Sequence, residues 1–198
     1  MTTGPAGTLD LPLRTEPAPI TVRDPFLEFL GLVGPGEPVH VTFTEIVKVA
    51  GHACPTVAGA YLVLKYGLAV LYGSEPAVRG AVRVTAYGSP TDFGYGPMAQ
   101  VINQVIGAAP ETGFAGMAGG RFRRRGLFVF RRDDVRRNEF DLERLDTAQA
   151  VHVAYDPSAL PTSREFSEAI APALSDRAGP QAIDHRRQVW LGRVDDIL

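Results

Sequence analysis

The chain is poor in cysteine, with a single residue, Cys54, in a length of 198. A lone cysteine excludes a disulfide within the chain, and the lack of any CxxC pair excludes a closed structural zinc site of the zinc-ribbon type. The sequence also opens without the basic segment and apolar run that are typical of a secretory signal. These absences favour a cytoplasmic location.

An excess of charge of one sign is also lacking, because 20 basic residues nearly balance 22 acidic ones and leave a net charge of −2. This balance gives no reason to expect nucleic acid or an anionic membrane as a partner, and we expect neither. The glycine-rich segment at 113–120 does not have the GxxxxGK[ST] pattern of a phosphate-binding loop. We expect the partner to be a small-molecule substrate or ligand.

One long apolar run is present, from Val57 to Tyr72, in a chain whose residues are 45% apolar. The run is shorter than a typical membrane span, and it contains Lys65, Gly59 and Gly67. We therefore expect a buried central helix rather than a helix that crosses a membrane.

The rest of the chain mixes strand and helix patterns without regular βαβ alternation. Alternating apolar residues predict strands at 38–43, 81–87, 126–130 and 150–155. We expect an α+β fold, in which a mixed, mainly antiparallel sheet packs against helices, with the buried central helix following the GHxCP motif described below.

Three segments are predicted: an N-terminal arm at 1–22, a core domain at 23–156 and a helical extension at 157–198. The arm carries three leucines between residues 9 and 13, interleaved with other residues, and has no core of its own. This pattern is typical of an arm that lies on a neighbouring protomer, so we expect a homodimer.

The first helix of the core domain is marked at both ends. Asp24 and Pro25 predict an N-cap and a first helical residue, and Gly31 predicts the end. Its apolar residues, which include Phe29 and Leu30, are expected to face inward.

The segment Gly51-His-Ala-Cys-Pro55 places the only cysteine two residues after a histidine. Pro55 favours the first position of a helix, so Cys54 is the predicted N-cap of the apolar helix and faces its free N–H groups. That position favours the thiolate, which is the form of cysteine that binds metals and acts as a nucleophile. Gly51 is predicted to end the preceding helix, for which Thr44 is the predicted cap.

His52 and Cys54 each have two possible roles. Cys54 is either a metal ligand or nucleophile, or a small buried side chain of the kind that free cysteines often are. His52 is either a ligand that shares one ion or proton with Cys54, or a turn residue that bonds to nearby backbone.

Two further groups are candidates for the site. Asp92 lies in a loop rich in glycine and proline between a strand and a helix, and is either a site residue or a solvated carboxylate. Arg121, Arg124 and Arg125 belong to the one basic cluster. This cluster either binds an anionic cofactor or protects the edge of a strand from aggregation.

The GHxCP motif, the glycine-bearing apolar helix after it and the loop Ser89-Pro-Thr-Asp92 resemble the core of the FmdE-like family, whose members are related to a small component of formylmethanofuran dehydrogenase. The similarity extends over roughly residues 40–132, and GHxCP is its most specific part. The resemblance implies that His52 and Cys54 are metal ligands in a cleft and that Asp92 is a site residue. Members of the family occur beside molybdenum or tungsten enzymes and as stand-alone proteins.

The chain departs from the family pattern in two places. It has Ser89 where relatives often have a second cysteine, and Ala50 where they often have a further histidine. A site with several thiolates is therefore lost. Imidazole and thiolate suit zinc, iron and copper rather than calcium or magnesium. We expect a transition metal, zinc or iron, bound as a free ion or as haem.

Two classes of function are expected. In the first, the protein is an oxidoreductase that acts on a small molecule, with Cys54 and Asp92 as catalytic residues and His52 and Cys54 as metal ligands. The cofactor contacts would then come from Arg121, Arg124 and Arg125. In the second, the protein is a non-catalytic metal- or haem-binding accessory protein or sensor.

Overall fold

A computed structural model describes residues 11–174 and 178–198, which form two sheets and six α-helices. The elements in chain order are β1 (Ile20–Arg23), α1 (Pro25–Phe29), β2 (Pro38–Val41), α2 (Phe43–Ala50), α3 (Pro55–Tyr72), β3 (Ala77–Val78), β4 (Val82–Ala86), α4 (Tyr95–Ile106), β5 (Phe128–Phe130), β6 (Glu139–Arg144), β7 (Ala150–Ala154), the 3₁₀ turn η1 (Pro157–Ala159), α5 (Arg164–Ala173) and α6 (Pro180–Ile197). The predicted α+β fold is confirmed.

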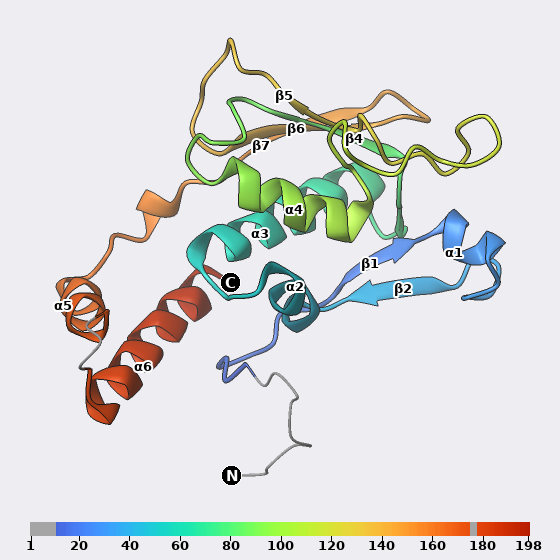
Figure 1. The fold of residues 1–198 in the computed structure, drawn as a ribbon. Helices are drawn as coiled ribbons and strands as arrows, with labels where there is room; N and C mark the ends of the chain where they lie inside the picture. The colour runs from blue at the N-terminus through green and yellow to red at the C-terminus, as the bar shows by residue number, and fades with distance from the viewer. Residues whose placement is uncertain (1–10, 175–177) are drawn as a thin grey trace.

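The larger sheet has four strands in the order β5-β4-β6-β7, and the smaller has three in the order β2-β1-β3. Antiparallel pairs join β4 to β6, β6 to β7 and β1 to β2, whereas β4 with β5 and β1 with β3 are parallel. Figure 1 shows α3 and α4 side by side beneath the four-stranded sheet, with β1 and α2 on their other side. The two helices therefore form the middle layer of the fold.

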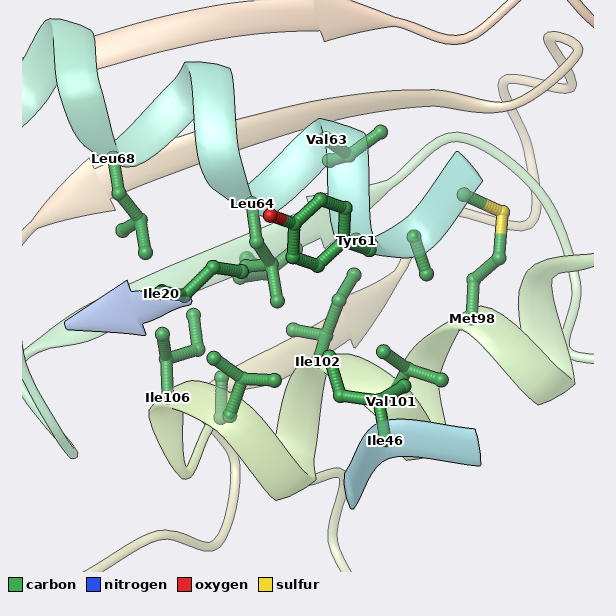
Figure 2. Packing of buried hydrophobic residues seen from close by; sticks show 14 of the residues in the cluster. Ile20, Ile46, Tyr61, Val63, Leu64, Leu68, Met98, Val101, Ile102 and Ile106 are labelled. Atoms are coloured by element: carbon green, nitrogen blue, oxygen red, sulfur yellow. The ribbon is translucent and has the colours of Figure 1, made fainter. Parts of the chain in front are cut away.

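The core lies where this middle layer meets its neighbours (Figure 2). Ile20 of β1, Ile46 of α2, Leu64 of α3 and Ile102 of α4 point toward one another there, and none is more than 6% exposed. Burial of apolar side chains from four separate elements removes a large apolar area from water, which is the main force that holds such layers together.

The helix α3 is the central buried helix that the apolar run predicts. It is long and apolar enough to cross a membrane, but 61% of it is buried inside the protein. Gly67 allows it to lie close to the sheet, because a Cβ at that position would be 2.8 Å from the side chain of Leu142 on β6. The burial of α3 in the core accounts for its apolar composition.

The predicted N-terminal arm is described only in part, since residues 1–10, with Leu9, lie outside the described residues. Leu11 and Leu13 pack against the core of their own chain, and Arg14 pairs with Asp195 and Asp196 of α6. The homodimer stays a prediction.

Tyr61 of α3 is fully buried, and its hydroxyl donates a hydrogen bond to the carbonyl oxygen of Ala18. Burial raises the pKa of Tyr61 to about 12, and the negative charge of Glu16 adds to this effect. The unfolded chain loses the tyrosine proton near pH 10, about two units before the folded protein does. The contribution of this group to the free energy of unfolding is therefore fully present below about pH 10 and is lost as the pH rises toward 12.

We expect Tyr61→Phe to remove this part of the alkaline loss of stability. The measurement is the free energy of unfolding by denaturant at neutral pH and at about pH 11. Between these two pH values, Tyr61→Phe should lose less stability than the wild-type protein. Equal dependence on pH in both proteins would contradict the assignment.

The N-terminus of α2 differs from the prediction. Thr42, and not Thr44, is the N-cap, and it forms a capping box with Glu45. Thr44 instead hydrogen bonds to Glu16 through its backbone N–H and its hydroxyl.

In α1 the predicted cap is present, since Asp24 accepts the backbone N–H groups of Phe26 and Leu27. The prediction that Phe29 and Leu30 face inward is wrong, because these side chains are 56% and 48% exposed. The physical reason is the length of the helix, since a helix of only five residues has no complete inward face.

Candidate functional site

The GHxCP motif forms the turn between α2 and α3, as the sequence predicts. Gly51 caps α2 with φ of 76°, a left-handed conformation that costs glycine little. Cys54 is the extended N-cap residue of α3, and Pro55 is its first helical residue. His52 and Cys54 therefore lie on either side of the buried Ala53 in one short turn.

The His52 side chain is exposed, and its Nδ1 lies 3.0 Å from the carbonyl oxygen of Ala50. A carbonyl oxygen only accepts, so Nδ1 carries the proton in this bond. In the neutral ring the Nε2 atom then has a free lone pair. This arrangement, in which one ring nitrogen is fixed by a backbone carbonyl, is typical of histidines that bind metals through the other nitrogen.

Cys54 is half-buried, packs against the core and makes no side-chain cap hydrogen bond. Its neighbour is Tyr155, whose hydroxyl donates to the carbonyl oxygen of Pro55 at 2.9 Å. Burial raises the pKa of Tyr155, the positive charge of Arg193 opposes this, and a negative charge on Cys54 adds to it. The thiol thus has a proton-bearing phenol nearby, and the charge of Arg193 acts on that phenol.

The helix α6 covers the motif from the other side. The indole N–H of Trp190, the only tryptophan, donates to the carbonyl oxygen of Ala53 at 2.6 Å. Its ring stacks on Phe166 of α5, with 5.6 Å between the ring centroids. The C-terminal helices are therefore attached to the turn that carries His52 and Cys54.

A groove of about 690 Å³ opens beside His52, between this turn and the helices α5 and α6. Its volume falls in the range of small-molecule and cofactor sites. Six apolar side chains form most of its walls: Leu11, Val47, Ile170, Leu174, Trp190 and Leu191. The groove can therefore accept a largely apolar molecule.

The charged residues at the groove all carry positive charge. Lys48 of α2 and Arg186 and Arg187 of α6 line it together with His52, and no acidic residue lies among its described lining residues. An apolar groove with cations at its edge suits a ligand that combines an apolar body with carboxylate or phosphate groups.

Asp92 lies near this turn but is not joined to it. Its carboxylate accepts the backbone N–H of Ser89 at 2.7 Å, which closes its own loop. Two residues further on, Gly94 packs on Thr56, the second residue of α3. Within residues 11–174 and 178–198, no hydrogen bond or ion pair connects Asp92 to His52 or Cys54.

The loop that carries the 121–125 cluster lies at the same end of the molecule as α1 (Figure 1), and Arg121 and Arg124 contact α1 and its cap rather than the motif. Arg124 forms a buried ion pair with Asp24 at 2.8 Å. The Arg121 guanidinium lies over the ring of Phe29, and Arg125 is exposed. The cations that the structure brings to His52 are those of Lys48, Arg186 and Arg187, and their role is not apparent from any local motif.

The described residues place few side chains of metal-binding type at this turn. No group of three or more His, Cys, Asp or Glu side chains within residues 11–174 and 178–198 is close enough to hold a metal ion. A free zinc ion usually has at least three protein ligands, whereas haem iron needs only one axial ligand. The donor atoms at this turn are His52 Nε2 and the Cys54 thiol.

Comparisons with protein-family models, with curated proteins and with solved structures found no match to this chain. The resemblance to the FmdE-like family consequently stays a prediction that rests on the GHxCP motif and the loop ending at Asp92.

Proposed function

We propose that the protein binds haem in the groove beside His52, with the His52 imidazole as the axial ligand. The observation that carries this proposal is the pairing of His52 Nδ1 with the Ala50 carbonyl at the edge of an apolar groove, which leaves Nε2 free. Trp190 and the apolar walls would hold the macrocycle and exclude water, and Lys48 and Arg187 would neutralise its carboxylates.

When bound, haem supplies an iron that changes oxidation state and binds small diatomic or peroxide ligands. A haem-binding accessory protein or sensor is the form of the proposal that the contacts support best, because His52, Cys54 and Asp92 are not joined in one hydrogen-bonded set. We also propose a cytoplasmic location for the protein.

Redox catalysis on a small molecule is the second candidate. It is favoured by Cys54, which lies at the start of α3 with the Tyr155 phenol nearby. In this form of the proposal, iron would replace haem as the redox centre if Cys54 joined His52 as a ligand and water completed the coordination. Zinc has no redox chemistry of its own, so in the same position it would act only as a Lewis acid.

The test is titration of the purified protein with haem, followed by absorption spectroscopy. Loss of a histidine axial ligand should weaken binding by about a hundredfold or more and shift the main absorption band, so we expect this of His52→Ala. Lys48→Gln and Arg187→Gln should each weaken binding by a smaller factor, about fivefold to tenfold.

His40→Ala is the matched control, because His40 is also exposed but bonds to Thr21 on the small sheet. An unchanged spectrum and affinity in His52→Ala would refute the haem proposal. If metal analysis instead finds zinc or iron without haem, and both His52→Ala and Cys54→Ala lose it, the free-ion form is correct.

A further inference from the structure

The end of the molecule at α1 carries an exposed apolar surface that we call the aromatic tip. It consists of residues from α1, from the turn after it, and from the loop at 113–126, which begins with the glycine-rich segment: Phe26, Phe29, Leu30, Leu32, Phe114, Met117 and Phe122. Leu32 is 68% exposed, and Met117 and Phe114 are exposed by 43% and 42%. Soluble proteins rarely expose so many large apolar side chains in one place without a binding role.

The tip is built by contacts between two segments that lie about ninety residues apart. The Phe26 ring lies between those of Phe114 and Phe122, with centroid distances of 5.3 Å and 5.0 Å. The ion pair between Asp24 and Arg124 also joins the loop to the N-terminus of α1. Figure 1 shows the yellow-green loop and α1 at the same end of the molecule. Stacked rings and a buried ion pair hold the tip in this shape.

Positive charge gathers on one side of the aromatic tip, on the loop at 113–126. The loop from Gly113 to Gly126 contains four arginines and no acidic residue. Arg121, Arg123 and Arg125 are exposed, and within residues 11–174 and 178–198 no carboxylate forms an ion pair with any of them. The net charge of −2 for the whole chain therefore conceals a local excess of positive charge where the apolar side chains project.

We propose that the aromatic tip inserts into an anionic membrane surface. Apolar side chains that enter the headgroup region, together with arginines that meet acidic lipids, are the two features that bind peripheral proteins to membranes. The attraction is local and needs no helix that spans the membrane.

A second copy of the chain is a poorer partner for this surface. Contact between two tips would bring their arginines together, and like charges repel. The apolar groove at His52 does not offer an opposite charge either, because Lys48, Arg186 and Arg187 line it. A lipid surface supplies negative charge and adapts its shape to projecting side chains, so charge complementarity favours it.

The test is co-sedimentation of the full chain with vesicles of phosphatidylcholine alone and of phosphatidylcholine with phosphatidylserine. We expect binding only to the vesicles that contain phosphatidylserine, and we expect high salt to release the protein. Replacement of Arg121 and Arg125 together by glutamine should weaken binding about fivefold for each arginine removed. Leu30→Ser with Leu32→Ser should weaken it by at least about tenfold.

Matched controls come from equally exposed residues elsewhere. Val70→Ser and Val135→Ser remove exposed apolar side chains, at 63% and 58% exposure, and Arg83→Gln with Arg164→Gln removes two positive charges. These variants should bind vesicles like the wild-type protein. Failure of the wild-type protein to bind anionic vesicles, or equal binding by tip and control variants, would overturn the proposal.

Sedimentation velocity without lipid provides the remaining comparison. If the wild-type protein self-associates and Leu30→Ser with Leu32→Ser abolishes the association, a second copy covers the tip and the membrane proposal is wrong. If the tip variants change vesicle binding but not self-association, the membrane is the partner. Because the tip lies apart from the His52 groove, this outcome is independent of the haem titration.

Discussion

Replacement of Asp24 by alanine is expected to lower the free energy of unfolding by about 3–5 kcal/mol, because it leaves two largely buried guanidinium groups without their counter-charge. The Asp24 side chain is 4% exposed, and its two oxygens bind Arg79 at 3.1 Å and Arg124 at 2.8 Å. Burial lowers the pKa of Arg79, Asp24 opposes this, and the positive charge of Arg124 adds to it. Without Asp24 the two arginines would repel each other in a site with little water.

Asparagine at position 24 separates the two roles of this residue. Asn caps a helix about as well as Asp, so Asp24→Asn keeps the cap of α1 and loses only the charge. We expect most of the destabilisation to remain in Asp24→Asn, as measured by equilibrium denaturation. Asp134→Ala is the control, because its ion pair with Arg136 lies at the surface and should contribute little. Similar stability in the Asp24 and Asp134 variants would contradict the expectation.

The Asp24 cluster also explains why the arginine run lies where it does. Arg79 binds Asp24 and the carbonyl oxygen of Gln104, at the C-terminal end of α4, while Arg124 brings the glycine-rich loop to the same point. Asp24 and Arg124 are one hundred residues apart. No local pattern predicts such a pairing, so the sequence alone does not show that the cluster belongs to α1.

Much of the fold is predictable because short-range signals mark the elements. Proline follows the N-cap in both α1 and α3, and Ser163, a residue type that commonly caps helices, is the N-cap of α5. The strand β6 is missed because its run Glu139–Arg144 is mostly polar and charged, and only its two inward apolar residues are buried. It is a strand because β4 and β7 pair with it on both sides. The short strands β1 and β3 likewise depend on partners distant in sequence.

The candidate site is likewise predictable only where the sequence signal is local. His52 and Cys54 are predictable because the motif is local and glycine and proline fix the turn around them. Trp190 binds the turn from 137 residues away, and Arg187 reaches the groove from the same helix. A single tryptophan in a mostly polar helix is a weak signal, since it indicates a contact with other elements but not which element it contacts.

Gly59→Ala is expected to lower the free energy of unfolding by about 2 kcal/mol, although alanine is the better helix former. A Cβ at this position would lie 2.3 Å from a ring carbon of Tyr155, and two more ring carbons would be within 2.7 Å. The ring cannot move away freely, because its hydroxyl bonds to the Pro55 carbonyl. Either the start of α3 shifts or this hydrogen bond breaks, so the surroundings of Cys54 change as well.

The measurement combines the free energy of unfolding with the rate at which Cys54 is alkylated, and both should change in Gly59→Ala. Gly192→Ala is the matched control, because Gly192 is also inside a helix but has nothing within 4 Å of an added Cβ. It should gain stability, by about 1 kcal/mol, from the helix preference of alanine alone. Replacing Tyr155 by leucine in the Gly59→Ala background should recover part of the loss, because the side chain that clashes is then removed. If Gly59→Ala is instead as stable as Gly192→Ala, the close packing of Tyr155 on α3, and with it the proposed neighbourhood of Cys54, is incorrect.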